Sequence, residues 1–256
     1  MSLADDVLGR LRRRRAIEAP VALVAAHPDD EVIGAGASLR LFQRLLLVHV
    51  TDGAPANGED ARAAGFATPA AYAGQRRREL YAALRLGGAQ PARAALGAQD
   101  QAASLRMAEL AEALVRLLRA HGTRLVVAHP YEGGHPDHDA ACWIAHAAAA
   151  RLGLPVLEMA SYHAGADGGR RCGGFLGDAE VVAAGLGAEE RALRRAMLGA
   201  FVTQGATLTG FEDAGEVFRA APAYDFAQAP HEGTLHYERY DWGMDGARWR
   251  AMVPRG

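Results

Sequence analysis

The chain has 256 residues, of which 50% are hydrophobic and 23% charged, and its formal net charge at pH 7 is −2. These values are typical of a soluble globular protein with a substantial core, and they argue against a surface built to bind nucleic acid. All 28 basic residues are arginine. The absence of lysine excludes Schiff-base chemistry, pyridoxal phosphate attachment and the lysine of a phosphate-binding P-loop.

Strands and helices are predicted to alternate along the first two thirds of the chain. The first 19 residues suit a polar, arginine-rich helix. Short apolar runs predict buried strands, at 20–26, 45–51, 123–130 and 154–162. Apolar spacing and terminal glycines predict helices, at 30–41, 71–88, 107–122 and 135–152. Residues 53–71, rich in Ala, Gly, Asn and Pro, are expected to form a long loop that carries function.

The alternating pattern weakens after about position 165, where a helix at 187–201 is followed by irregular chain with short strands. No linker or repeat divides the sequence. We therefore expect one α/β domain over residues 1–256, with a mostly parallel sheet covered by helices on both faces. Its core is expected at about 20–165, and the C-terminal third is expected to complete the substrate side.

The cellular setting is predicted from what the sequence lacks. Cys142 and Cys172 are the only cysteines, too few for a disulfide framework or a thiolate zinc site, and Cys142 is expected to be buried and inert. The N-terminus lacks the pattern of a signal peptide, and no apolar stretch is long enough to span a bilayer. We expect a cytoplasmic protein that does not insert into membranes.

Two clusters of ionisable residues follow predicted strands, "HPDDE" at 27–31 and "HPYEGGHPDHD" at 129–139. Ligands of open parallel sheets bind at the carboxyl ends of the strands, so we expect both clusters on the same rim. All of their donor atoms are nitrogen or oxygen. The candidate donors are His27, Asp29, Asp30, His135, Asp137 and His138.

This set of donors predicts a catalytic divalent ion, held by two histidines and one carboxylate with a position left for water. Pro136 fits the first position of a helix, which places His135 and His138 on adjoining surfaces of its first turn. The helix N-terminus favours neutral imidazole, the form that binds metal. Asp29 and Asp137 are alternatively helix caps, but two clusters on one rim favour the metal centre.

The motifs "AHPDDE" and, about a hundred residues later, "GHPDHD" resemble those of the PIG-L/LmbE-like family of metal-dependent deacetylases. The segments "TDG" at 51–53 and "RRREL" within 76–87 support the resemblance, which covers roughly residues 20–165. Members of this family remove acetyl groups from N-acetylglucosaminyl compounds. The resemblance implies a Rossmann-like three-layer sandwich and a bound Zn²⁺, with Fe²⁺ or another divalent ion as the alternative.

The resemblance also implies roles for individual residues. His27, Asp30 and His138 become the metal ligands, and Asp29 becomes the general base that takes a proton from water and passes it to the leaving amine. His135 is expected to stabilise the oxyanion or to assist proton transfer. Asp137 is expected to orient His135.

Two further residues are expected to contact substrate. Arg76 matches an arginine that family members place near the sugar, although Arg77 and Arg78 leave its register open. Tyr131 lies between the strand at 123–130 and the second motif and is expected to line the pocket. His49 and His129 are expected to be core or rim histidines, with a catalytic role as the alternative, and Glu31 to support the site or start the helix without binding metal. Four residues are assigned to packing of the C-terminal segment, with a surface facing the substrate as the alternative: His231, His236, Trp242 and Trp249.

The sequence thus predicts a hydrolase that removes the N-acetyl group from a small amino sugar or its conjugate. One alternative is a related deacylase that acts on another N-acyl group or a thiol-sugar conjugate. A Rossmann-like binding protein without catalysis is the alternative from another class, but carboxylates follow the first strand where a phosphate-binding protein has a glycine-rich loop. A homo-oligomer is left open.

Overall fold

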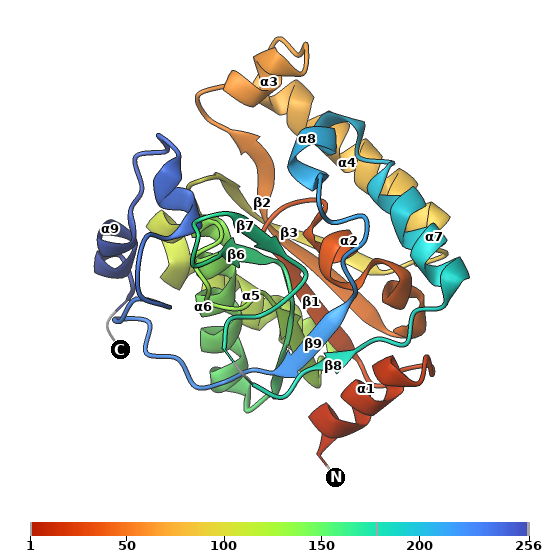
Figure 1. The fold of residues 1–256 in the computed structure, drawn as a ribbon. Helices are drawn as coiled ribbons and strands as arrows, with labels where there is room; N and C mark the ends of the chain where they lie inside the picture. The colour runs from red at the N-terminus through yellow and green to blue at the C-terminus, as the bar shows by residue number, and fades with distance from the viewer. Residues whose placement is uncertain (1, 178, 255–256) are drawn as a thin grey trace.

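The computed structural model describes residues 2–177 and 179–254, which are built around a seven-stranded sheet of order β3-β2-β1-β4-β5-β9-β8 (Figure 1). The pairs formed among β3, β2, β1, β4 and β5 are parallel, whereas β9 and β8 are added antiparallel at one edge. The predicted, mostly parallel sheet is confirmed. The strands of this sheet are β1 (Val21–Ala25), β2 (Leu45–Pro55), β3 (Ala92–Asp100), β4 (Leu125–Ala128), β5 (Val156–Met159), β8 (Val182–Ala183) and β9 (Val217–Ala220).

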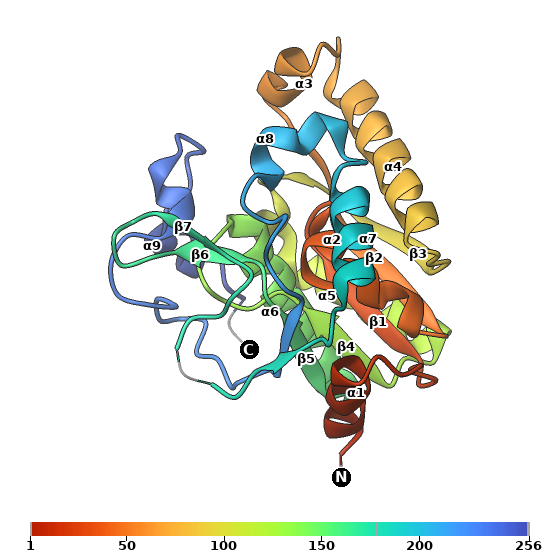
Figure 2. The same cartoon turned by 45° about the vertical axis from the view of Figure 1, so that its right-hand side comes forward.

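Helices cover both faces of the sheet, which confirms the three-layer arrangement (Figures 1 and 2). Strand β1 shows why, because successive side chains point to opposite faces: Leu23 packs in one core and Val24 in the other. The first core is shared with α1 (Leu3–Arg12), α2 (Asp30–Ala35), α4 (Pro69–Leu86) and α7 (Ala188–Leu198). The second is shared with α5 (Met107–His121) and α6 (Pro136–Leu152).

The region between β1 and α4 differs from the prediction in two places. The expected helix at 30–41 is α2 followed by the 3₁₀ helix η1 (Gly36–Leu41). Gly34 allows α2 to lie close to the sheet, since a Cβ there would come within 2.5 Å of the Met159 sulfur. The expected loop at 53–71 was too long, because β2 continues to Pro55 and α3 (Glu59–Ala63) follows.

Strand β3 was not predicted. It is the edge strand next to β2, and most of its side chains are exposed or half-buried. This edge strand has the sequence ARAALGAQD, in which Leu96 is the only large apolar residue, so the long apolar run that reveals a buried strand is missing. The strand matters for the site because it ends at Asp100.

The C-terminal third joins the sheet and then passes over its carboxyl edge. The expected strand at 154–162 is shorter, because β5 ends at Met159 and Tyr162 begins a separate two-stranded sheet. The remaining elements are β6 (Tyr162–Ala164), β7 (Arg170–Cys172), η2 (Ala103–Arg106), η3 (Val202–Gln204), α8 (Gly205–Leu208), η4 (His236–Arg239) and α9 (Gly246–Ala251).

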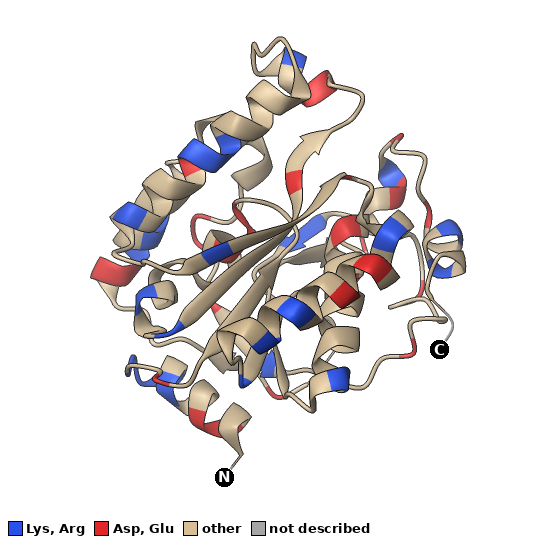
Figure 3. Ribbon diagram, turned by 180° about the vertical axis from the view of Figure 1, so that it is seen from behind, with Lys and Arg blue, Asp and Glu red and all other residues tan. Residues whose placement is uncertain are grey.

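Charged residues of both signs are interspersed along the exposed helices on the face drawn in Figure 3. This distribution agrees with the small net charge of −2. Within residues 2–177 and 179–254, every helix is too short or too polar to cross a lipid bilayer.

Candidate metal centre and active site

A cleft of about 120 Å³ lies at the carboxyl edge of the parallel strands, where both predicted clusters meet. His27 follows β1, Asp100 ends β3, and His135 caps the N-terminus of α6. The cleft has a charged side and an apolar side. Its lining residues are His27, Asp29, Asp30, Ile33, Asp60, Arg76, Asp100, Gln101, His135, His138, Tyr162, Gln204, Thr207, Phe211 and Trp242.

His27, Asp30 and His138 form a compact group whose donor atoms all lie within 4.8 Å of one another. Nδ1 of His27 is 3.3 Å from Asp30 Oδ2, and Nε2 of His138 is 3.2 Å from Asp30 Oδ1. Burial lowers the pKa of His138 to about 4, so its imidazole is neutral at pH 7. Two imidazoles and one carboxylate, all buried, are the donor set of a catalytic zinc site.

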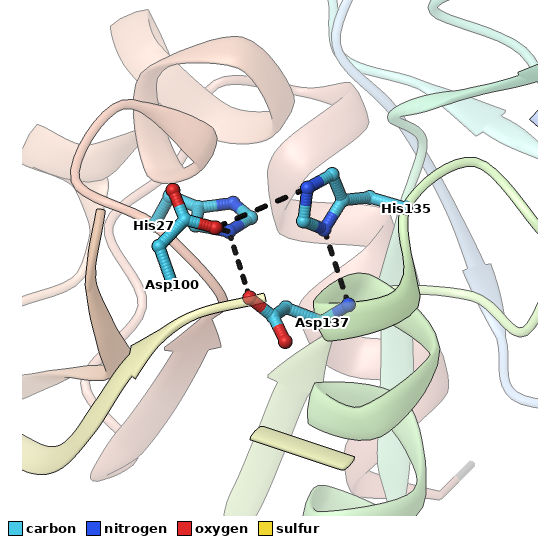
Figure 4. A group of neighbouring side chains, drawn as sticks. All are labelled: His27, Asp100, His135 and Asp137. Atoms are coloured by element: carbon cyan, nitrogen blue, oxygen red, sulfur yellow. Dashed lines mark hydrogen bonds and ion pairs between the residues drawn. The ribbon is translucent and has the colours of Figure 1, made fainter. Parts of the chain in front are cut away.

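The far side of the His27 ring faces two carboxylates (Figure 4). Nε2 of His27 is 3.1 Å from Asp100 Oδ1 and 3.3 Å from Asp137 Oδ2. Metal-binding histidines commonly give their second nitrogen to a carboxylate, which orients the ring and raises its basicity. The arrangement therefore fits a His27 that binds the metal through Nδ1 and donates from Nε2.

His135 lies beside this group, but its hydrogen bonding distinguishes it from a ligand. Nδ1 of His135 accepts a hydrogen bond of 3.1 Å from the backbone N–H of Asp137. Burial and the neighbouring His27 lower the pKa of His135 well below its usual value, so the ring is neutral. A neutral ring that accepts at Nδ1 carries its proton on Nε2. His135 is therefore a hydrogen-bond donor, with Nε2 4.0 Å from Asp100 Oδ1.

Asp29 is a buried carboxylate in the same cleft, held by Arg76. Its backbone φ of 157° and ψ of −27° are rare for a residue other than glycine, a form of strain that is common at functional sites. Nη2 of Arg76 donates to Asp29 Oδ2 at 2.7 Å. Burial raises the pKa of Asp29 to about 7, although the positive charge of Arg76 opposes this shift. The pKa of Asp29 is thus close to the value that a general base needs at neutral pH.

The structure resolves the register of the three consecutive arginines. Arg76 is buried, whereas Arg77 and Arg78 are exposed. Besides Asp29, Arg76 contacts the carbonyl oxygens of Gly53, at 2.6 Å, and Pro28, at 3.2 Å. Two of its three hydrogen bonds therefore hold the backbone of β2 and of the turn after β1 beside the cleft.

Two predicted residues have surroundings other than those expected. The Asp137 carboxylate points away from His135, toward His27 and the backbone N–H groups of Gln101 and Ala103, because these lie at the end of β3. Its contact with His135 is through the main chain. Tyr131 does not line the cleft.

Tyr131 is buried in the core instead, where its ring stacks on Trp249 with centroids 5.2 Å apart. Its hydroxyl donates to the carbonyl oxygen of Gln228 at 2.9 Å. The assignment of Tyr131 to the substrate is therefore wrong for this structure. Its position after the strand was an insufficient guide, because the C-terminal segment covers it.

Three residues of the site were missed or assigned only to packing. Asp100 was missed together with its strand. His129 is fully buried, stacks on His138 and lies 3.3 Å from Asp30 Oδ2 through Nε2. The repeated tripeptide Ala-His-Pro, at 26–28 and again at 128–130, was the signal that could have revealed it. Trp242 lines the cleft beside His135, with ring centroids 4.8 Å apart.

The described residues include two further groups of potential metal ligands. One joins His27 to its neighbours Asp100, Asp137 and His135, and the other, formed by Cys142, His146 and Glu158, lies outside the cleft. The Glu158 carboxylate is already bound by Arg219 at 2.7 Å and by the hydroxyl of Tyr224 at 2.6 Å. We interpret this group as a buried ion-pair network that attaches β9 to β5. Cys142 is fully buried, as expected.

Comparisons with known proteins agree with this geometry. Residues 22–149 match the family model described as "PIG-L: GlcNAc-PI de-N-acetylase". No curated protein sequence matches the chain significantly.

Three solved structures illustrate the similarity in fold. A complex of the deacetylase from the biosynthesis pathway of teicoplanin has a TM-score of 0.61 and 18% identity, over 78% of this chain and 96% of that chain. The zinc inhibited form of teicoplanin deacetylase has a TM-score of 0.58 and 18% identity, over 78% and 97%. N,N'-diacetylchitobiose deacetylase from Pyrococcus horikoshii has a TM-score of 0.59 and 19% identity, over 86% and 90%.

Proposed function

The chain belongs to the PIG-L family, and on this premise we propose that it is a metal-dependent hydrolase that removes the N-acetyl group from an N-acetylglucosamine-type amino sugar or conjugate. One observation carries the proposal. The buried group of His27, Asp30 and His138 shares a cleft with an acid of raised pKa, Asp29, and a neutral imidazole donor, His135. Metal-dependent amide hydrolysis uses these three functions together.

The metal would be held by His27, Asp30 and His138, whose donors suit zinc and also ferrous iron. A divalent ion there would polarise the amide carbonyl and acidify water as a Lewis acid. The structurally similar teicoplanin deacetylase has been described in a zinc inhibited form, so the assay should test Zn²⁺ and Fe²⁺ separately. Asp100 and Asp137 keep the His27 ring in position through its Nε2.

The protons are handled by the chain's own residues. Asp29 accepts the proton of the attacking water and returns it to the leaving amine, while Arg76 keeps the carboxylate directed into the cleft. Nε2–H of His135 donates to the oxygen that becomes negatively charged when the carbonyl is attacked. The apolar side of the cleft, formed by Ile33 and Phe211 among others, suits the acetyl methyl group.

Release of acetate from a panel of N-acetylglucosamine conjugates, with Zn²⁺ or Fe²⁺ added, tests the activity. An Asp29→Asn variant is expected to keep its metal and to lose roughly 10²–10⁴-fold in kcat, the usual contribution of general acid–base catalysis. Unimpaired turnover by this variant would remove Asp29 from the mechanism. Absence of acetate from every conjugate would refute the proposed activity.

Metal content provides a separate test of the site. We expect about one divalent ion per chain, lost on His138→Ala and kept in the matched control His121→Ala. His121 lies at the end of α5, outside the cleft. Equal metal content in the two variants would contradict the assignment of the ligands.

A further inference from the structure

A second, larger cavity adjoins the catalytic cleft. This cavity has a volume of about 400 Å³, against about 120 Å³ for the cleft. Asp60, Gln204 and Thr207 line both of them. The two hollows therefore adjoin each other, so the cavity lies beside a molecule whose amide is placed at the metal ligands.

The walls of this cavity come from elements that the family match only partly covers. Asp60 belongs to α3 and Tyr72 to α4, whereas Val202, Thr203 and Gln204 form η3, well beyond residue 149. Helices α3 and α8 lie close together at the same end of the molecule in Figures 1 and 2. The cavity is therefore formed in part by residues outside the segment that matches the family model.

The wall formed by η3 is held in place by hydrogen bonds. The hydroxyl and backbone N–H of Thr203 donate to Glu79 of α4 at 2.6 and 3.2 Å. Nε2 of Gln204 donates to the Tyr72 hydroxyl at 2.5 Å. These contacts attach η3 to α4, so the cavity is present before a ligand binds.

Several polar groups in the cavity remain available to a ligand. Among the described residues, Gln204 forms hydrogen bonds through its Nε2 and its backbone, and its Oε1 accepts none. No hydrogen bond among them involves the Thr207 hydroxyl or the Asp60 carboxylate. Their oxygens are acceptors for hydroxyl groups, and Thr207 is also a donor. The exposed Val202 side chain, 80% accessible, adds an apolar surface at the rim.

The negative charge of the cavity disfavours an anionic ligand such as a phosphate. Its single charged lining residue is Asp60, and no arginine is among the described residues that line it. Arg76, in the adjoining cleft, is already paired with Asp29. A phosphate group in the cavity would therefore face the Asp60 carboxylate with no cation among the described lining residues, and like-charge repulsion disfavours it.

From this geometry we propose that the cavity binds an uncharged, hydroxyl-rich group attached to the reacting amino sugar, such as a second sugar ring. The preferred substrate is then a neutral glycoconjugate, rather than a free monosaccharide or a phosphate-bearing conjugate. The inference rests on the proposed deacetylase activity. Binding energy from this remote group would be used to position the amide, and so would raise kcat/KM.

The experiment compares kcat/KM for acetate release from three kinds of probe. These are free N-acetylglucosamine, a neutral disaccharide of N-acetylglucosamine and glucose in both the α- and β-linked forms, and N-acetylglucosamine 1-phosphate. We expect at least one disaccharide to exceed the monosaccharide by roughly tenfold or more, equivalent to about 1.4 kcal/mol, and the phosphate to show no gain. Equal values for disaccharide and monosaccharide, or a preference for the phosphate, would overturn the inference. Absence of acetate from all probes would instead refute the proposed activity.

Two variants locate the effect in the cavity. Ala64→Trp fills it and should reduce the ratio of disaccharide to monosaccharide kcat/KM to about one, whereas the matched control Ala120→Trp, on the exposed face of α5, should leave this ratio unchanged. Asp60→Asn keeps the shape and removes the charge, so the ratio for the phosphate should rise. An unchanged ratio in both cavity variants would show that the second group binds elsewhere.

Discussion

The contact between Arg76 and Asp29 gives a prediction whose size follows from the structure. Both side chains are about 5% exposed, and Arg76 makes three hydrogen bonds, to Asp29, Gly53 and Pro28. Arg76→Met keeps the approximate volume but leaves the buried Asp29 carboxyl group without its cation and the carbonyl oxygens of Gly53 and Pro28 without their donor. Breaking a buried pair in this way costs about 3–5 kcal/mol. At about 2–4 °C per kcal/mol for a chain of this size, Tm should fall by roughly 6–20 °C.

The assay is thermal and urea unfolding in the presence of a chelator, so that metal binding does not contribute. Arg77→Met is the matched control, because Arg77 is exposed and its loss should change stability by less than about 0.5 kcal/mol. The double variant Arg76→Met/Asp29→Asn removes the unpaired charge and should be more stable than Arg76→Met alone. If Arg76→Met is as stable as Arg77→Met, the reasoning about the buried pair is wrong.

Three further predictions concern other parts of the molecule. Asp100→Asn should weaken metal binding roughly 10–100-fold, because His27 loses a charged partner 3.1 Å from its Nε2; unchanged affinity in a competition with a chelator would contradict this. Gly134→Ala should destabilise the protein and displace His135, since its Cβ would lie 2.1 Å from the Tyr162 carbonyl oxygen, whereas Gly205→Ala meets no atom within 4 Å and should be tolerated; equal melting temperatures would refute the contrast. Burial raises the pKa of Glu132 from 4.5 to about 7, so its contribution to stability is complete below pH 4.5 and is lost as pH rises toward 7. Glu132→Gln should flatten this fall in urea midpoints measured between pH 4.5 and 7, and a curve parallel to the wild type would exclude the residue as its source.

Much of the fold was predictable because its signals are local. The buried strands β1 and β4 are continuous apolar runs, and α6 begins at Pro136, whose fixed φ suits the first helical position. Strand β3 could not be predicted in this way. Most of its side chains are exposed or half-buried and it pairs with β2, so its own sequence carries only a weak apolar pattern.

The candidate site was predictable in its donors but not in its full composition. The motifs contain His27, Asp29, Asp30, His135 and His138 in recognisable order. Asp100 approaches His27 from a strand about seventy positions away, and the contact exists only because β3 is added beside β2. Trp242 reaches the cleft from the C-terminal segment, a region whose sequence shows no periodic pattern.

The sequence by itself determined which chemical groups are available: imidazoles and carboxylates at the ends of two strands, and an arginine triplet on a helix. The tertiary structure alone decided how each group is used. The rotation of α4 selects Arg76 over its neighbours to face the cleft. The C-terminal segment, through Trp249 and Gln228, covers Tyr131 and so places it in the core. Which nitrogen of His135 carries the proton depends on the backbone N–H of Asp137, which donates to Nδ1. These outcomes depend on distances and directions between distant segments, which packing of the sheet and helices sets and local sequence does not encode.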